Sequence, residues 1–195
     1  MEDKQLNPNE SIQLIEQMIR STKNKLADDG VLLIFWGWLV VVSALVNYVG
    51  LQFQYENSGL VWAILMPVGG IFSALYGRYQ NKQRNVKTAL DGYLSYLWAG
   101  FGIALVITLV CGFSYGIKPV YFSLMILYGL ATFVSGGLLG FKPLIYGGIA
   151  SFICAVVSIF LSEMDQLLII IIALLASYII PGHLLRSKFK SQQNV

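Results

Sequence analysis

Charged side chains are scarce in this sequence. Only 12% of the 195 residues are Asp, Glu, Lys or Arg, whereas 56% are hydrophobic. A soluble domain carries about a quarter of its residues as charges, so this composition excludes a soluble globular domain. A chain so rich in apolar residues is not an intrinsically disordered protein either.

Residues that bind metals or form disulfides are equally few. The chain has one histidine and two cysteines, Cys111 and Cys154, each within an apolar run. That position suits packed thiols better than a disulfide framework. A single histidine without clustered carboxylates cannot supply a metal site, and no phosphate-binding glycine loop is present. We therefore expect no cofactor and no metal. The net charge of +3 is too small to indicate nucleic-acid binding.

Long apolar segments dominate what remains. A bilayer core of about 30 Å requires about 20 apolar residues per helix. Six segments meet this requirement, at about 31–50, 60–77, 93–112, 120–141, 143–162 and 167–185. The sequence therefore predicts an all-α, polytopic membrane bundle of six transmembrane helices.

The distribution of lysine and arginine predicts the orientation. Six spans place twelve of the thirteen basic residues on one side: Lys4, Arg20, Lys23, Lys25, Arg78, Lys82, Arg84, Lys87, Lys142, Arg186, Lys188 and Lys190. Only Lys118 lies on the other side, with Glu56, Glu163 and Asp165. Because basic loops remain in the cytoplasm, we expect both termini there, in a bacterial cytoplasmic (inner) membrane. The chain then divides into an amphipathic arm (1–30), the membrane domain (31–185) and a basic tail (186–195).

The arm reads as one amphipathic helix over residues 7–27. Asn7 suits the N-cap, Pro8 the first helical position, and Glu10 follows three residues after the cap. This helix either lies on the membrane surface or the inner mouth of the bundle, or docks onto a cytosolic partner. Residues 1–30 carry six acids and four bases, whereas helices that bind anionic lipid are rich in lysine and arginine. A contact with the basic loop 78–92 is an alternative.

The spans contain few residues with catalytic or ion-coupling chemistry. Their centres lack Asp, Glu, Lys, Arg and His, which disfavours a proton-coupled transporter or an ion pump. Asn47 lies near an outer end, where we expect it to meet water. Ser135 and His183 invite comparison with rhomboid proteases, but Thr132 or Phe133 stands where the Gly-x-Ser-Gly motif requires glycine. We therefore expect a packing serine, an interfacial histidine and no enzyme.

Helix-breaking residues mark a candidate substrate-binding region. Pro67, Gly69 and Gly70 interrupt the second span, and Pro181 and Gly182 interrupt the sixth. Interrupted helices in two halves of a protein can form a transport site. These five residues are thus the candidate site of a channel or facilitator for a small neutral or apolar solute.

Small residues recur every four positions in three spans. They are Gly69, Ser73 and Gly77; Gly136 and Gly140; and Gly147, Ser151 and Ala155. Small residues at this spacing allow helix backbones to approach closely. Packing within the chain is the favoured explanation, and a homo-oligomer is the alternative.

Several strings resemble one group of proteins. ESIQLIEQMI with LLIFWGWLVVVSAL, LMPVGGIFS, FKPLIYGG and SYIIPGHLLRSKFK together resemble small six-helix integral membrane proteins of the Bacteroidetes type. This resemblance implies a six-helix architecture, and it implies no catalytic or ligand-binding residues.

The function expected from these patterns is that of a non-enzymatic membrane protein. The connections on the external side are short, so a regulator or accessory subunit would act through the cytoplasmic face. Its partner, a cytosolic or membrane protein, would contact residues 7–27 and 78–92. The alternatives are the channel or facilitator and, more remotely, an intramembrane hydrolase.

Overall fold

The computed structural model describes residues 29–83 and 89–193 of the chain. Within them all regular structure is helical. The helices are α2 (Asp29–Gln52), α3 (Leu60–Gln83), α4 (Ala89–Tyr115), α5 (Ile117–Leu139), α6 (Lys142–Ser158), α7 (Glu163–Leu174) and α8 (Ile180–Gln193), with a π-helix η2 (Leu175–Ile179) between the last two. The expected all-α membrane bundle is confirmed. The arm at residues 7–27 and the segment 84–88 lie outside the described residues. Most of the loop expected at 78–92 is helical instead, since residues 78–83 belong to α3 and residues 89–92 to α4.

Five helical segments are long and apolar enough to cross a membrane. Four of them belong to α2, α3, α4 and α5, and the fifth runs continuously from Glu163 to Lys188 through η2. The remaining predicted span, 143–162, is a shorter apolar helix that ends at Ser158. Its 17 residues rise about 25 Å, less than the hydrocarbon core of a typical bilayer.

Several connections are tighter than the sequence suggested. The loop expected at 113–119 is a turn at Gly116, whose φ of 85° with extended ψ is a conformation almost reserved for glycine. Gly140 ends α5 in the left-handed conformation, and Pro143 opens α6. The loop expected at 163–166 is already helical, because the hydroxyl of Ser162 caps α7 by accepting a hydrogen bond from the Asp165 backbone N–H. The tail after residue 185 continues as α8.

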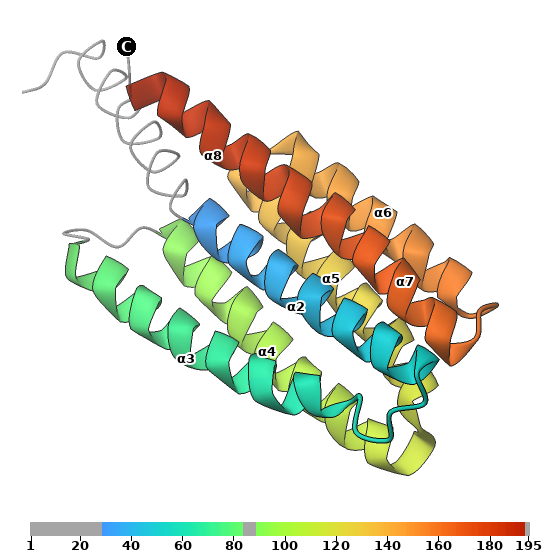
Figure 1. The fold of residues 1–195 in the computed structure, drawn as a ribbon. Helices are drawn as coiled ribbons and strands as arrows, with labels where there is room; N and C mark the ends of the chain where they lie inside the picture. Colours follow the sequence, from blue (N-terminus) through green and yellow to red (C-terminus); the bar gives the residue numbers. More distant parts are fainter. Residues whose placement is uncertain (1–28, 84–88, 194–195) are drawn as a thin grey trace, which may run out of the picture.

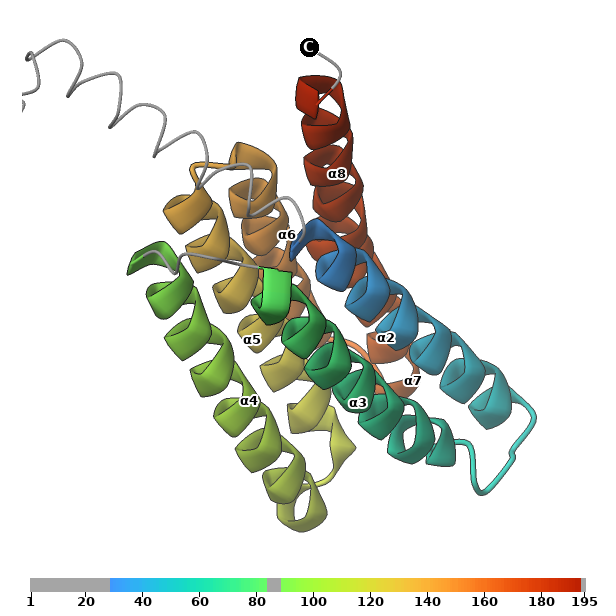
Figure 2. The ribbon, with the colours of Figure 1, turned by 90° about the vertical axis from the view of Figure 1, so that its left-hand side faces the viewer.

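The helices form two columns of three. One column stacks α3 on α2 and α2 on the α7–η2–α8 segment, and the other stacks α4 on α5 and α5 on α6 (Figures 1 and 2). The columns meet closely where α7 and η2 contact α5 and α6. The backbones of α2 and α5, and those of α3 and α4, hardly approach each other. Side chains connect α2 and α5, and we call this contact the inter-column seam.

Burial differs sharply between the inner helices and the outer pair. In the most apolar stretches of α2, α5 and the last span, 44–50% of the residues are buried, against 6% in α3 and none in α4. The core is therefore built by α2, α5, α6 and the α7–η2–α8 segment. Helices α3 and α4 are attached to it, each along one side.

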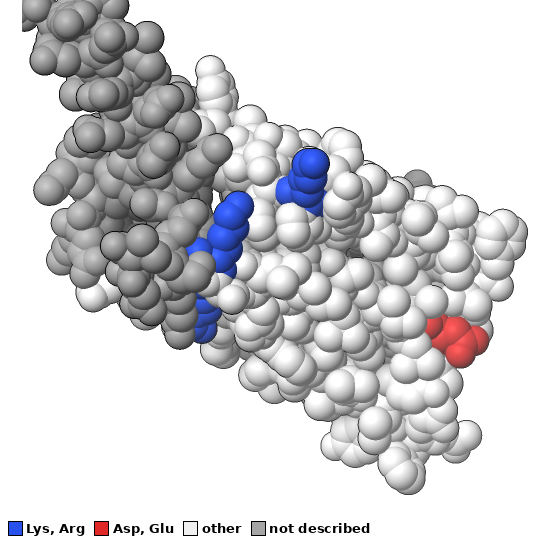
Figure 3. Space-filling view, turned by 90° about the horizontal axis from the view of Figure 1, so that it is seen from above, with Lys and Arg blue, Asp and Glu red and all other residues white. Residues whose placement is uncertain are grey.

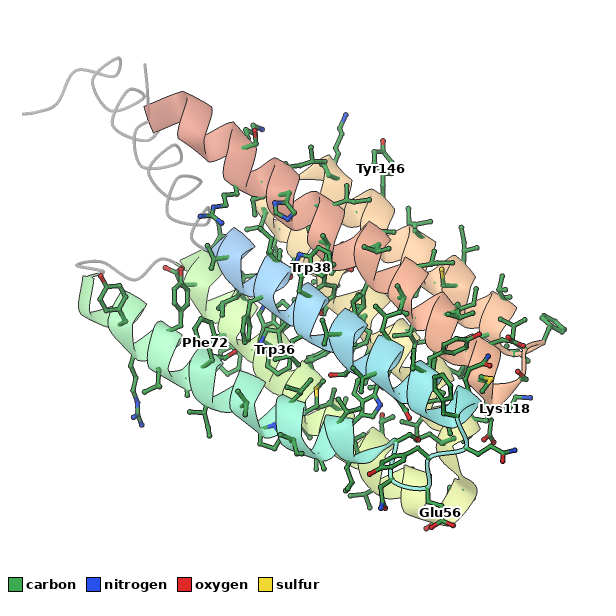
Figure 4. All side chains as sticks on the ribbon, viewed as in Figure 1. Trp36, Trp38, Glu56, Phe72, Lys118 and Tyr146 are labelled. Atoms are coloured by element: carbon green, nitrogen blue, oxygen red, sulfur yellow. The ribbon has the colours of Figure 1, made fainter. Side chains whose placement is uncertain are left out.

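Charges sit at the two ends of the bundle. Arg78, Lys142, Arg186 and Lys188 mark one end, which we call the basic end; Glu56, Lys118, Glu163 and Asp165 mark the other, the acidic end. Figure 3 shows basic and acidic groups near opposite ends with uncharged surface between them, and Figure 4 places Glu56 and Lys118 together at the acidic end. This arrangement suits a membrane-spanning body with two water-facing ends.

Candidate functional site

The predicted helix breaks lie in two separate places. Gly69 of α3 packs on α2, where a Cβ would lie 3.0 Å from Trp36 and Leu39 atoms. Gly182 of α8 also packs on α2, where a Cβ would lie 2.7 Å from Ile34. Trp36 and Ile34 are two residues apart, a rotation of about 200° around the helix, so their side chains lie on nearly opposite faces of α2. The structure thus places the two groups of breaks on opposite sides of α2.

The break in α3 leaves the helix intact and faces outward. Pro67 is exposed within a continuous α-helix, and a Cβ at Gly70 would meet no atom within 4 Å. The inward side of α3 is held by Trp36, whose Nε1 donates a 2.8 Å hydrogen bond to Ser73 Oγ, and by Phe35, whose ring contacts that of Phe72 at 4.2 Å between centroids with a tilt of 31°. Figure 4 shows Trp36 and Phe72 where α2 and α3 face each other.

The break in the last span, Pro181 and Gly182, is buried and lies just after the π-helix. The Ile180 backbone N–H donates to Leu175 O, five residues back, as a π-helix requires. Pro181, fully buried, has no N–H to donate to Ala176 O in the same register. Ala176 O lies against α6, where a Cβ at Gly147 would come within 2.5 Å of it. Glycine is therefore required at position 147 for α6 to pack on this carbonyl.

Neutral polar side chains occupy the core. Most hydroxyls bond backbone carbonyls: Thr132 Oγ1 bonds Tyr128 O, Ser177 Oγ bonds Ala173 O, and Ser151 Oγ bonds Met125 O of the neighbouring helix. Asn47, expected to meet water, is instead 4% exposed, and its Nδ2 donates to Tyr121 Oη at 3.3 Å. Because Asn47 lies on α2 and Tyr121 on α5, this bond crosses the seam.

Four side chains keep a buried polar atom without a hydrogen-bond partner among the described residues. They are Trp62 Nε1 on α3, and Ser135 Oγ, Gln166 Oε1 and Tyr178 Oη in the core. The burial of Gln166 is explained by its amide nitrogen. Gln166 Nε2 donates to Ser158 O and so satisfies a carbonyl at the C-terminal end of α6. The Tyr178 hydroxyl has no such compensating hydrogen bond, although the residue is only 3% exposed.

Aromatic rings connect Tyr178 to the outer helix α4. Trp98 contacts Phe101 at 5.4 Å between centroids, Phe101 contacts Tyr128 at 5.9 Å, and Tyr128 contacts Tyr178 at 5.5 Å. Exposure falls along this series, from 36% at Trp98 to 6% at Tyr128 and 3% at Tyr178. Sequence reasoning missed this series, because Trp98, Tyr128 and Tyr178 lie on three helices far apart in the chain.

The serine and histidine weighed for hydrolysis are not brought together. Ser135 is buried on α5, and its Oγ makes no hydrogen bond within the described part of the chain. His183 is exposed on α8. A serine nucleophile requires a histidine within hydrogen-bonding distance, so this pair does not form the catalytic dyad of the rhomboid comparison. Among the described residues, no group of three or more His, Cys, Asp or Glu could hold a metal ion.

The small-residue patterns serve packing within the chain where they face the core. A Cβ at Gly136 would come within 2.7 Å of the Ile145 backbone, and a Cβ at Gly147 within 2.5 Å of Ala176 O. On the outer helices Gly69 and Gly112 are in close contact with neighbouring helices, whereas the other five glycines have nothing within 4 Å of such a Cβ: Gly70, Gly77, Gly92, Gly100 and Gly102.

Comparison with known proteins adds no identification: no family model, no curated protein and no solved structure matches this chain.

Proposed function

We propose that the protein is a non-enzymatic accessory or regulatory subunit that binds a membrane protein through α3 and α4. The observation that carries the proposal is the contrast between the inner and outer helices. Core glycines such as Gly136, Gly147 and Gly148 contact neighbouring helices, whereas five of the seven glycines on α3 and α4 have no atom of another helix within 4 Å of the place of a Cβ. Small residues on a membrane helix favour close approach by another helix.

The basic end supplies the second part of this interface. Helix α3 continues to Gln83, beyond its apolar stretch, and α4 begins at Ala89, so both helices extend into the basic segment 78–92 that the sequence predicted as a loop. We place this end and both termini in the cytoplasm of a bacterium, with the bundle in the inner membrane. The partner then contacts α3 and α4 in the bilayer, and loop 78–92 and the arm 7–27 in the cytoplasm.

Site-specific photo-cross-linking in native membranes tests this proposal. A photoreactive residue replaces Ile103 of α4 in one variant and Ile153 of α6 in the other; both positions are exposed and apolar, at 64% and 60%. We expect one discrete protein adduct from position 103 and lipid adducts alone from position 153. Gly100→Phe is expected to remove the position-103 adduct without unfolding the protein. Lipid adducts alone at both positions would contradict the proposal.

The arm is tested separately by deleting residues 1–27 from the variant labelled at position 103. If the arm contributes to partner binding, the yield of the adduct falls. An unchanged yield limits the interface to α3, α4 and the loop between them.

A second candidate, a facilitator for a small neutral solute, is favoured by the uncharged polar core. Side chains from Tyr121 to Ser135 place polar groups along one face of α5 over about 21 Å. Proteoliposomes with the full-length protein would show solute flux above that of empty vesicles if this function holds. The absence of flux across a panel of small neutral solutes would exclude it.

A further inference from the structure

The interior end of the aromatic series has an unusual combination of features. Tyr178 lies on a π-helix, and its hydroxyl is buried without a hydrogen-bond partner among the described residues. A buried, unsatisfied donor destabilises a protein by about 1–3 kcal/mol. Short π-helical insertions also weaken a helix and are frequent at functional sites. Two unfavourable features at one residue indicate a requirement other than stability.

The surroundings of this hydroxyl define what it can bind. Ring contacts lead from Trp98 on the membrane-facing side of α4 through Phe101 and Tyr128 to Tyr178. The partly buried residues that pack against the core from α3 and α4, such as Met66 and Leu105, are also apolar. Asp, Glu, Lys, Arg and His are absent from the buried residues of the described core. A ligand at this place is therefore uncharged, largely apolar and equipped with an oxygen that accepts a hydrogen bond.

Backbone packing between the two columns is sparse on the side of α3 and α4. Helices α3 and α4 hardly contact each other, and α2 and α5 meet through side chains rather than through close backbone packing. Separating side chains requires only rotamer changes, which are fast, whereas separating α5 from α6 would break backbone contacts such as Gly129 with Gly148. Access between α3 and α4 therefore leaves the tightly packed helices in place.

We propose that Tyr178 Oη is the hydrogen-bond donor of an interior binding site for an uncharged, membrane-soluble molecule with a carbonyl oxygen. The molecule reaches the site between α3 and α4 and contacts Phe101 and Tyr128 on the way. The site does not depend on the proposed partner, because the seam and Tyr178 belong to this chain alone.

Photolabelling of the full-length protein in phosphatidylcholine nanodiscs tests the site. Benzophenone is the probe, since it is apolar, carries one carbonyl and reacts on irradiation with nearby C–H bonds. We expect adducts in the segments 98–101, 125–131 and 174–182, mapped by mass spectrometry. Adducts confined to membrane-facing positions such as Ile103 and Ile153 would overturn the proposal.

A pair of tyrosine variants isolates the hydrogen bond. Tyr178→Phe keeps the ring and removes the donor, and we expect labelling of the interior segments at limiting probe to fall about 5- to 30-fold. Tyr146→Phe is the matched control, because Tyr146 is 66% exposed and points away from the bundle (Figure 4). Its labelling stays at the wild-type value. Equal labelling of Tyr178→Phe and wild type would overturn the proposal.

A competition experiment on the unmodified protein keeps the test decisive if Tyr178→Phe does not fold. Dicyclohexyl ketone and dicyclohexylmethane differ mainly by the carbonyl oxygen. We expect the ketone to suppress interior benzophenone labelling at a concentration at least 5-fold lower than the hydrocarbon. Equal suppression by both compounds would show that the hydroxyl binds no acceptor there.

Discussion

Glycine positions distinguish the residues that hold this bundle together from those that leave surfaces open. Gly147 sits against the backbone of η2, with Ala176 O and Ser177 Cα 2.5 and 2.8 Å from the place of a Cβ. Gly100, on α4, has nothing within 4 Å of that place. The same residue type therefore has opposite structural consequences at these two positions.

This difference predicts opposite outcomes for two alanine variants. Gly147→Ala forces α6 away from η2, and overpacking of this kind lowers the free energy of unfolding by about 1–3 kcal/mol. Gly100→Ala fills open space, so the free energy of unfolding stays within about 1 kcal/mol of wild type. Reversible unfolding in mixed micelles measures both. Equal destabilisation by the two substitutions would mean that the α6–η2 contact is not as close as described.

At the scale of elements, the sequence predicted the helices far better than their arrangement. The apolar stretches fix where helices lie, because each must span the bilayer core. They do not show which helices are buried, since lipid is as apolar as leucine and membrane helices lack a polar face. Helices α2 and α4 have the same mean hydropathy of 2.1 in their spans, yet 44% of one stretch is buried and none of the other.

The candidate site shows the same limit. Pro181 and Gly182 were recognised from the sequence, and they adjoin the π-helix that carries Tyr178. Pro67 and Gly70 were recognised by the same reasoning but face outward on α3. Proline and glycine mark a local backbone property, whereas the meeting of Tyr178, Tyr128 and Phe101 depends on packing between three helices. The sequence carries no pattern that shows which helices pack together, so it does not predict the contacts among these three rings.

The loose attachment of α3 and α4 predicts a difference in the spread of interhelical distances. Spin labels at Ile71 and Ile103 report on α3 and α4, and labels at Leu130 and Ile149 report on α5 and α6; all four side chains are exposed. Cysteines 111 and 154 are first replaced by alanine. We expect electron–electron double resonance to give a broader distribution for the first pair, because few contacts restrain it. Equally narrow distributions would contradict this picture of the outer helices.

At the scale of the whole molecule, the separation of charge predicts the topology. Single cysteines at Tyr55 and Lys188, with Cys111 and Cys154 replaced, mark the acidic and basic ends, and both positions are exposed. In intact spheroplasts a membrane-impermeant maleimide is expected to label position 55 at once and position 188 only after permeabilisation, since basic ends stay in the cytoplasm. The reverse labelling order would invert the assigned topology.

Native mass spectrometry of the complex extracted from its own membranes determines whether another membrane protein covers α3 and α4. We expect a stoichiometric assembly of the 21.6-kDa chain with a different polypeptide, and loss of that polypeptide in the Gly100→Phe variant. The single chain with lipids alone, or multiples of its own mass alone, would contradict the accessory role.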